Sequence, residues 1–118
     1  MIIGLESFLY HYKARVVSVY DGDTVTLDID HGRRHWQKNV KCRLYGIDTP
    51  EVRGEERLQG LVVRDWLRNR LPSGTEVIIK THRDKTGKYG RDLVTIFHEC
   101  KDINQLLVDL KMAEERIY

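Results

Sequence analysis

The residues of this chain that could do chemistry gather in three short segments. They are Asp21-Gly22-Asp23-Thr24, Arg43-Leu44-Tyr45-Gly46-Ile47-Asp48-Thr49-Pro50-Glu51 and Lys88-Tyr89-Gly90-Arg91. The first two segments carry acids, which can bind metal ions or activate water. The arginines of the last two can hold anions such as phosphate through paired hydrogen bonds. The combination is typical of metal-assisted chemistry on an anionic substrate.

The two aspartates at strand ends form the first candidate site. Asp23 begins one expected strand after a tight turn, and Asp48 ends another strand before a proline. If these strands pair antiparallel, the two carboxylates repel each other and need a cation between them, and the backbone carbonyl of Thr49 could add a third oxygen. Such oxygen ligands fit calcium or magnesium rather than zinc. Asp-Gly-Asp is equally typical of a plain hairpin turn, and an EF-hand is excluded because Thr26 stands where that loop needs glycine.

Glu51 and two arginines could complete a hydrolytic site. Hydrolysis of a phosphodiester needs a water that is oriented and deprotonated, and a glutamate beside a divalent cation is placed to do this. The phosphate gains negative charge as water attacks, and Arg43 and Arg91 could grip its oxygens. Each residue also has a plainer interpretation, because Glu51 suits a helix N-terminus and arginines are usually exposed surface residues.

Five short strands are expected to position these segments, at residues 15–19, 24–30, 40–47, 75–81 and 93–98. Strict alternation puts Val25, Leu27 and Ile29 on one face of the second strand, and Asp-Gly predicts the hairpin before it. The same alternation makes Cys42 a small core residue in the third strand. Residues 1–12 have no clear period and could be an extra strand or a loose arm.

Two helices are expected to pack on these strands. The first covers residues 55–71 and ends at Pro72-Ser73-Gly74, and the second begins after Asp102 as its N-cap. The predicted apolar stripe of the first contains Leu58, Leu61, Val62 and Trp66, widened by Val63 and Leu67, and that of the second contains Ile103, Leu106, Leu107 and Leu110. Three strands, a helix, two strands and a helix predict an α+β, mainly β fold, a five-stranded OB-type Greek-key barrel with two or three packed helices.

Length and charge limit the remaining possibilities. A chain of 118 residues is expected to form one domain over residues 1–118, as a monomer. Its net charge is only +2, so attraction to nucleic acid would come from local clusters of basic residues, in residues 33–43 and 80–91, rather than from total charge. A solvated surface is the plainer interpretation of these clusters.

The sequence shows no membrane or export signal. It has no long apolar run, and its start lacks a basic head followed by an apolar stretch. We therefore expect no membrane partner and favour a cytoplasmic location, unless a leader has been removed. The two cysteines, Cys42 and Cys100, show no metal-binding spacing.

In their order and spacing, the three segments closely resemble the staphylococcal nuclease (thermonuclease-like) family, over about Ala14 to Ala113. The resemblance implies an OB barrel and calcium-dependent cleavage of DNA and RNA at the bond to the 5′ oxygen. It also implies a role for each matching residue. By resemblance, Asp23 and Asp48 would bind Ca²⁺ through their side chains and Thr49 through its carbonyl, and Glu51 would be the general base or would position water. Arg43 and Arg91 would bind and polarise the phosphate. Lys88 and Tyr89 would lie near the terminal phosphate, and Tyr118 would contact the base.

Two other functions remain open from sequence alone. The first is a non-catalytic OB-fold module that binds single-stranded nucleic acid or a protein. For nucleic acid, Trp36, Tyr45 and Tyr89 are the best stacking residues. The second is a regulatory or structural calcium domain. The nuclease is favoured because only a phosphate-cleaving site uses the acids and the arginines together.

Overall fold

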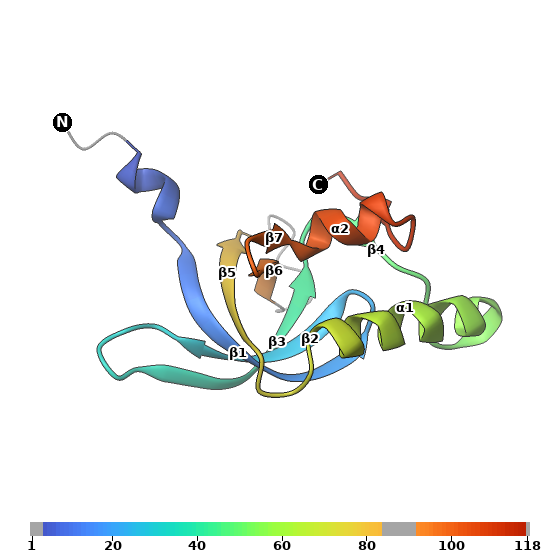
Figure 1. Cartoon of the computed structure of the whole chain (residues 1–118), viewed down its shortest axis with the longest axis horizontal. Helices are drawn as coiled ribbons and strands as arrows, with labels where there is room; N and C mark the ends of the chain where they lie inside the picture. Colours follow the sequence, from blue (N-terminus) through green and yellow to red (C-terminus); the bar gives the residue numbers. More distant parts are fainter. Residues whose placement is uncertain (1–3, 84–91, 118) are drawn as a thin grey trace.

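The strands form a closed barrel in the computed structural model, which describes residues 4–83 and 92–117 (Figure 1). Its strands are β1 (His11–Asp21), β2 (Thr24–Asp30), β3 (Trp36–Leu44), β5 (Glu76–His82) and β6 (Asp92–His98). Antiparallel pairing joins β1 to β2 and β5, β2 to β3, and β5 to β6, and parallel pairing of β3 with β6 closes the barrel. This is the OB arrangement, so the predicted fold class is confirmed.

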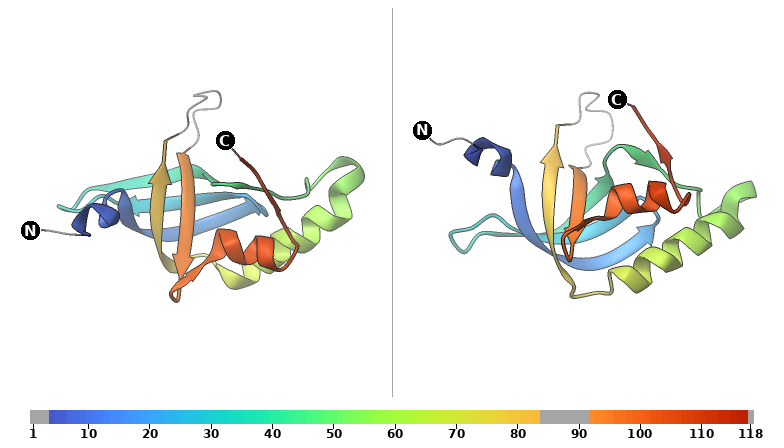
Figure 2. Two further views of the ribbon diagram at one scale, coloured as in Figure 1. Left: turned by 90° about the horizontal axis from the view of Figure 1, so that it is seen from above. Right: turned by 45° about the horizontal axis from the view of Figure 1, so that its top comes forward.

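Two α-helices and several short elements complete the fold. The helices are α1 (Arg57–Arg70) and α2 (Ile103–Asp109), and the 3₁₀ turns are η1 (Leu5–Phe8) and η2 (Gly54–Glu56). The short strands are β4 (Ile47–Asp48), β7 (Lys101–Asp102) and β8 (Glu114–Glu115), of which β4 and β8 pair antiparallel. Figures 1 and 2 show η1 and the tip of the β2–β3 hairpin at one end of the molecule and α1 at the other.

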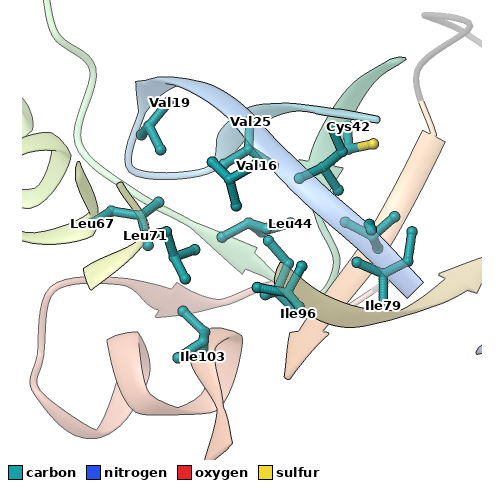
Figure 3. Packing of buried hydrophobic residues seen from close by; sticks show 14 of the residues in the cluster. Val16, Val19, Val25, Cys42, Leu44, Leu67, Leu71, Ile79, Ile96 and Ile103 are labelled. Atoms are coloured by element: carbon teal, nitrogen blue, oxygen red, sulfur yellow. The ribbon is translucent and has the colours of Figure 1, made fainter. Parts of the chain in front are cut away.

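The core lies inside the barrel and beneath the helices. Val25, Leu27 and Ile29 are all buried, as the alternation in β2 predicts. Figure 3 shows the barrel side chains meeting Leu67 of α1 and Ile103 of α2. Packing of this kind fixes both helices against the strands, and therefore fixes the ends of the strands that carry the candidate site.

The two cysteines have different surroundings. Cys42 is buried in the core as predicted, whereas Cys100 is exposed, and both are free thiols. Burial and the nearby carboxylate of Asp92 raise the pKa of the Cys42 thiol to about 12. At neutral pH Cys42 therefore stays protonated and serves as a small apolar core residue.

The prediction for the buried face of α1 was partly wrong. The helix buries Gly60, Val63 and Leu67, whereas Leu58 and Val62 are 75% and 62% exposed. The reason is contact at Gly60, where an added Cβ would lie only 2.0 Å from the carbonyl oxygen of Glu51. Because glycine has no side chain, the two backbones approach closely here. The helix therefore turns toward the barrel a different face from the predicted one.

Smaller differences concern where elements begin and which residues they bury. β1 starts at His11 and β3 at Trp36, earlier than the sequence predicts, because the first residues of β1 pair with β5 and those of β3 pair with β2. Asp102 caps α2 as expected, accepting a hydrogen bond from the N–H of Gln105 at 3.0 Å. Leu110, predicted on the apolar stripe, lies just past α2 and is exposed.

No helix in residues 4–83 or 92–117 is both long and apolar enough to cross a membrane.

Candidate active site

The turn between β1 and β2 brings two aspartates to one end of the barrel. Asp21 is buried, and its Oδ1 accepts a hydrogen bond from the N–H of Asp23 at 3.1 Å. Gly22 is required between them, because a Cβ there would lie 2.5 Å from Val63 and 2.8 Å from the hydroxyl of Thr49. The segment is therefore a hairpin turn, which was the simpler of the two sequence interpretations. The turn is buried against α1 rather than exposed.

Arg43 joins this turn because β3 pairs with β2. Arg43 is the partner of Thr24 in the ladder, and the N–H of Leu44 donates to the carbonyl of Asp23 at 2.8 Å. The Nη2 of Arg43 donates to Asp23 Oδ2 at 3.4 Å and also donates to Asp48 Oδ1. One guanidinium thus lies between the two carboxylates that the sequence analysis paired.

Asp48 and Thr49 approach from the other side. Asp48 lies in β4, which is held by its pairing with β8, and the N–H of Thr49 donates to Asp23 Oδ2 at 3.3 Å. The hydroxyl oxygen of Thr49 is buried and has no hydrogen-bond partner within the described residues. The peptide of Thr49 is therefore fixed against Asp23 by its backbone, with its side chain packed inward.

These residues line one cleft of about 770 Å³. Five predicted site residues face it together: Asp23, Arg43, Asp48, Thr49 and Glu51. Glu51 is exposed, and its N–H donates to Glu56 Oε2 at 3.0 Å, which fixes the backbone just before η2. The four other predicted residues, Lys88, Tyr89, Arg91 and Tyr118, lie outside the described residues.

Electrostatics make Asp23 unusual among the acids of the cleft. Its burial, followed by the hydrogen bond with Asp21 and that residue's negative charge, raises the pKa of Asp23 to about 6 from 3.8. The guanidinium of Arg43 and the N–H of Thr49 act in the opposite direction. A carboxylate held this way gains strongly from any additional cation that comes close.

The donor set suits a hard divalent cation. Among residues 4–83 and 92–117, no three histidine, cysteine, aspartate or glutamate side chains stand close enough to form a metal cluster. Two carboxylates, Asp23 and Asp48, nevertheless hold a positive charge between them, that of Arg43, whose side chain is only 12% exposed. Because this place already accepts a cation and offers only oxygen ligands, the residues present fit calcium or magnesium.

The structure adds residues that sequence reasoning missed. Asp21 belongs to the first segment, and only its burial beside Asp23 reveals its electrostatic effect. Arg116 had no local signal, yet its Nη1 lies 3.3 Å from Asp48 Oδ1, and its N–H donates to Gly46 at 2.7 Å. Arg53 and Arg68 also line the cleft, whose lining holds five basic and four acidic side chains.

Comparison with known proteins shows the family of this chain. The family model described as staphylococcal nuclease homologue matches residues 41–118. The chain belongs to the staphylococcal nuclease family. The nuclease-family match includes Arg43, Asp48, Thr49 and Glu51, which all lie in the cleft.

One curated relative of this nuclease-family chain is an uncharacterized protein of Methanocaldococcus jannaschii, MJ1439. The two are 30% identical over an alignment 132 residues long. The alignment includes 92% of this chain and 60% of the relative. The chain thus spans less than two thirds of the relative's length.

Proposed function

We propose that this chain is a calcium-dependent phosphodiesterase that hydrolyses DNA, RNA or both, and that residues 1–118 form one nuclease domain. The observation that carries the proposal is the position of Arg43, between Asp23 and Asp48 at the wall of a cleft that Glu51 also lines. The cleft then holds two acids that can bind a cation, an arginine that can bind a phosphate and an exposed glutamate that can orient a water.

Asp23 and Asp48, with the carbonyl of Thr49, are the proposed calcium ligands. Bound calcium would supply positive charge that stabilises the phosphate and makes a nearby water easier to deprotonate. Asp21 supports the arrangement by raising the negative charge density behind Asp23. Its buried carboxylate also fixes the turn through the N–H of Asp23.

Arg43 is the proposed phosphate-binding group. In the structure its guanidinium forms ion pairs with both Asp23 and Asp48, so a cation between those acids would release it to donate to a phosphate beside them. A guanidinium offers two parallel donors to phosphate oxygens, and it stabilises the charge that develops as the phosphorus is attacked. By resemblance to the family, Arg91 makes a second such contact.

Glu51 is the proposed general base or water-positioning group. Its side chain is exposed at the rim of the cleft, where a water beside the bound phosphate can reach it. Its backbone is held by Glu56 and by the close approach of Gly60, so its position does not depend on substrate. By resemblance, Lys88 and Tyr89 contact the terminal phosphate of the substrate, and Tyr118 contacts a base.

Cleavage of labelled single-stranded DNA and RNA, with calcium or with a chelator, tests the proposal. We expect cleavage only with calcium, and a loss of about 10²–10³-fold in rate for Glu51→Gln and Arg43→Ala, the scale of one transition-state group. Glu76→Gln changes an exposed glutamate on β5 outside the cleft and is the matched control, expected to cut normally. Cleavage that persists in chelator would contradict the calcium dependence.

The alternative is an OB-fold module that binds nucleic acid without cutting it. Trp36 favours a binding role, because this aromatic side chain is 37% exposed beside two cations. Calcium-independent binding that leaves every substrate intact would support this alternative over the nuclease.

A further inference from the structure

A basic and aromatic surface lies on the outer face of β1, β2 and β3, between the cleft and the β2–β3 hairpin. The guanidinium carbon of Arg15 lies 5.2 Å from the centre of the Trp36 ring, and the Nζ of Lys38 lies 5.0 Å from it. Both distances are within the range of cation–π attraction. The indole ring is thus partly exposed at the surface, and two cationic groups lie over it.

The acids of this face are already engaged. Asp28 lies 3.6 Å from Lys38 and accepts a hydrogen bond from the N–H of Asn39 at 2.9 Å. Its side chain is 15% exposed, compared with 60% for Lys38. Asp30 accepts from the N–H of Gly32 at 2.8 Å, within the hairpin. A ligand approaching from solvent therefore meets mainly the basic groups.

This surface is continuous with the candidate active site. Thr26 and Lys41, which are partners in the β2–β3 ladder, line the cleft together with Arg43. From Arg43 to Trp36 the strand extends about 23 Å at a rise of 3.3 Å per residue. Lys41 lies between them, so Arg43, Lys41 and Lys38 follow β3 from the cleft toward the hairpin. Figure 1 shows the course of β3.

The hairpin tip adds two arginines in an unfavourable backbone conformation. Arg33 and Arg34 have φ values of 54° and 66°, in the left-handed region. Asparagine or glycine adopts this region at lower cost, and hairpin tips usually use them. Arginine at both positions extends the positive surface beyond the end of the strands.

We propose that the outer face of β1–β3 is a binding track for single-stranded nucleic acid, which runs from the cleft to the hairpin. Trp36 stacks on an unpaired base, which replaces one of the two cations over its ring, and the released cation contacts phosphate together with Lys41. Single strands are favoured over duplexes because their bases are free to stack on an aromatic ring. The track deepens the proposed function and rests on it for one point only, that the bound strand continues into a cleft that cuts it.

Binding of fluorescein-labelled oligodeoxythymidylate, measured in chelator so that no strand is cut, tests the track. Trp36→Ala is expected to weaken binding of a 12-nucleotide strand by about 5- to 150-fold, the range for loss of one stacked base. The loss for a 3-nucleotide strand is expected to be smaller, because so short a strand gains little from the hairpin end. Trp36→Phe, which keeps an aromatic ring, is expected to recover most of the affinity.

Two control variants separate a specific track from a general surface effect. Phe8→Ala removes another exposed aromatic residue, on η1, and Lys101→Ala removes an exposed lysine on β7. Both are expected to bind the 12-nucleotide strand as the unaltered protein does. Lys38→Ala is expected to lower the slope of log affinity against log salt by about 0.7, the value for one phosphate contact on a single strand. Trp36→Ala is expected to keep that slope.

Unaltered binding by Trp36→Ala, or equal losses for the short and long strands, would overturn the track. So would recovery by Trp36→Leu as complete as recovery by Trp36→Phe, because leucine cannot stack. These outcomes are independent of catalysis. A protein that fails to cut nucleic acid with calcium would contradict the proposed function, while binding in chelator would still decide whether the track exists.

Discussion

The two ends of strands β1–β3 carry charge in different ways. At the cleft end, Asp23 and Arg43 have side chains only 13% and 12% exposed, and their partners are fixed by ladder pairing and by α1. At the hairpin end, Lys38 is 60% exposed and Trp36 has two cations over its ring. The same strands thus carry two largely buried charged side chains at one end and an open basic surface at the other.

This difference separates two kinds of molecular recognition. Desolvated groups held by a packed scaffold interact strongly and in one geometry, which suits bond cleavage. Exposed cations and an aromatic ring bind a flexible polyanion with little dependence on sequence. Substitutions at the cleft end should therefore cost more, and in a more geometry-dependent way, than equivalent substitutions at the hairpin end.

Replacing one arginine at each end tests this contrast most strongly. Arg43→Lys keeps the charge but loses the planar fork, and we expect cleavage to fall by about 10²–10³-fold, as for loss of one preorganised donor. Arg15→Lys makes the same change beside Trp36 and is expected to cause a much smaller loss. Initial rates on a 12-nucleotide strand with calcium provide the measurement. Equal losses at both ends would contradict the contrast.

A pair of glycine substitutions compares the packing of the two ends. In Gly60→Ala the new Cβ would meet the backbone of Glu51 at 2.0 Å, so the helix or the Glu51 segment must move. We expect a loss of about 1–3 kcal/mol in the free energy of unfolding, typical of overpacking, together with reduced cleavage. Denaturant unfolding and cleavage rates measure both.

Gly32→Ala is the matched change at the hairpin. Its φ of +81° strains an alanine, but no atom lies within 4 Å of the added Cβ. We expect a loss of about 1 kcal/mol or less with cleavage retained. If Gly60→Ala were as mild as Gly32→Ala, the close contact that positions Glu51 would not hold in solution.

The raised pKa of Asp23 predicts a pH effect at the cleft end. Its pKa is about 6 in the folded chain and 3.8 when unperturbed, so the folded state binds more protons between these values. Stability in chelator is therefore expected to fall as pH rises from about 4 to about 6. Asp23→Asn should remove this component, and saturating calcium should reduce it by favouring the charged carboxylate. Thermal unfolding against pH measures the effect, and an unchanged profile in Asp23→Asn would contradict the assignment.

A weaker pH effect is expected at the stacked pair Tyr45 and His82, whose ring centres lie 3.8 Å apart. Burial, reinforced by the charge of Lys80, lowers the pKa of His82, whose Nε2 pairs with the hydroxyl of Thr95 at 2.8 Å. The neutral ring is favoured by folding, so stability is expected to decline as pH falls below about 6.5, the ordinary pKa of histidine. His82→Phe keeps an aromatic ring and should lose this component. Trp36, held by Arg15 and Lys38, should show no comparable titration.

The sequence by itself determined the order of the strands, the alternation of β2 and the cap of α2. These features depend on local patterns, namely a period of two, the Asp-Gly turn and an aspartate before an apolar run. It also predicted Asp23, Arg43, Asp48, Thr49 and Glu51 as site residues from short segments of recognisable composition, and these five line one cleft. The proposed roles of Lys88, Tyr89, Arg91 and Tyr118 remain predictions from the family resemblance.

Only the tertiary structure decided which atoms meet. Which face of α1 is buried depends on the contact between Gly60 and Glu51. The spacing of apolar residues in the helix does not reveal this contact, so Leu58 and Val62 were wrongly predicted to be buried. Arg116 reaches Asp48 only because β8 pairs with β4, across 68 residues of chain. The pKa of Asp23 likewise depends on burial and on its surroundings in space. Local patterns specify elements and residue types, whereas contact and desolvation are set by the packing of segments that are distant in the chain.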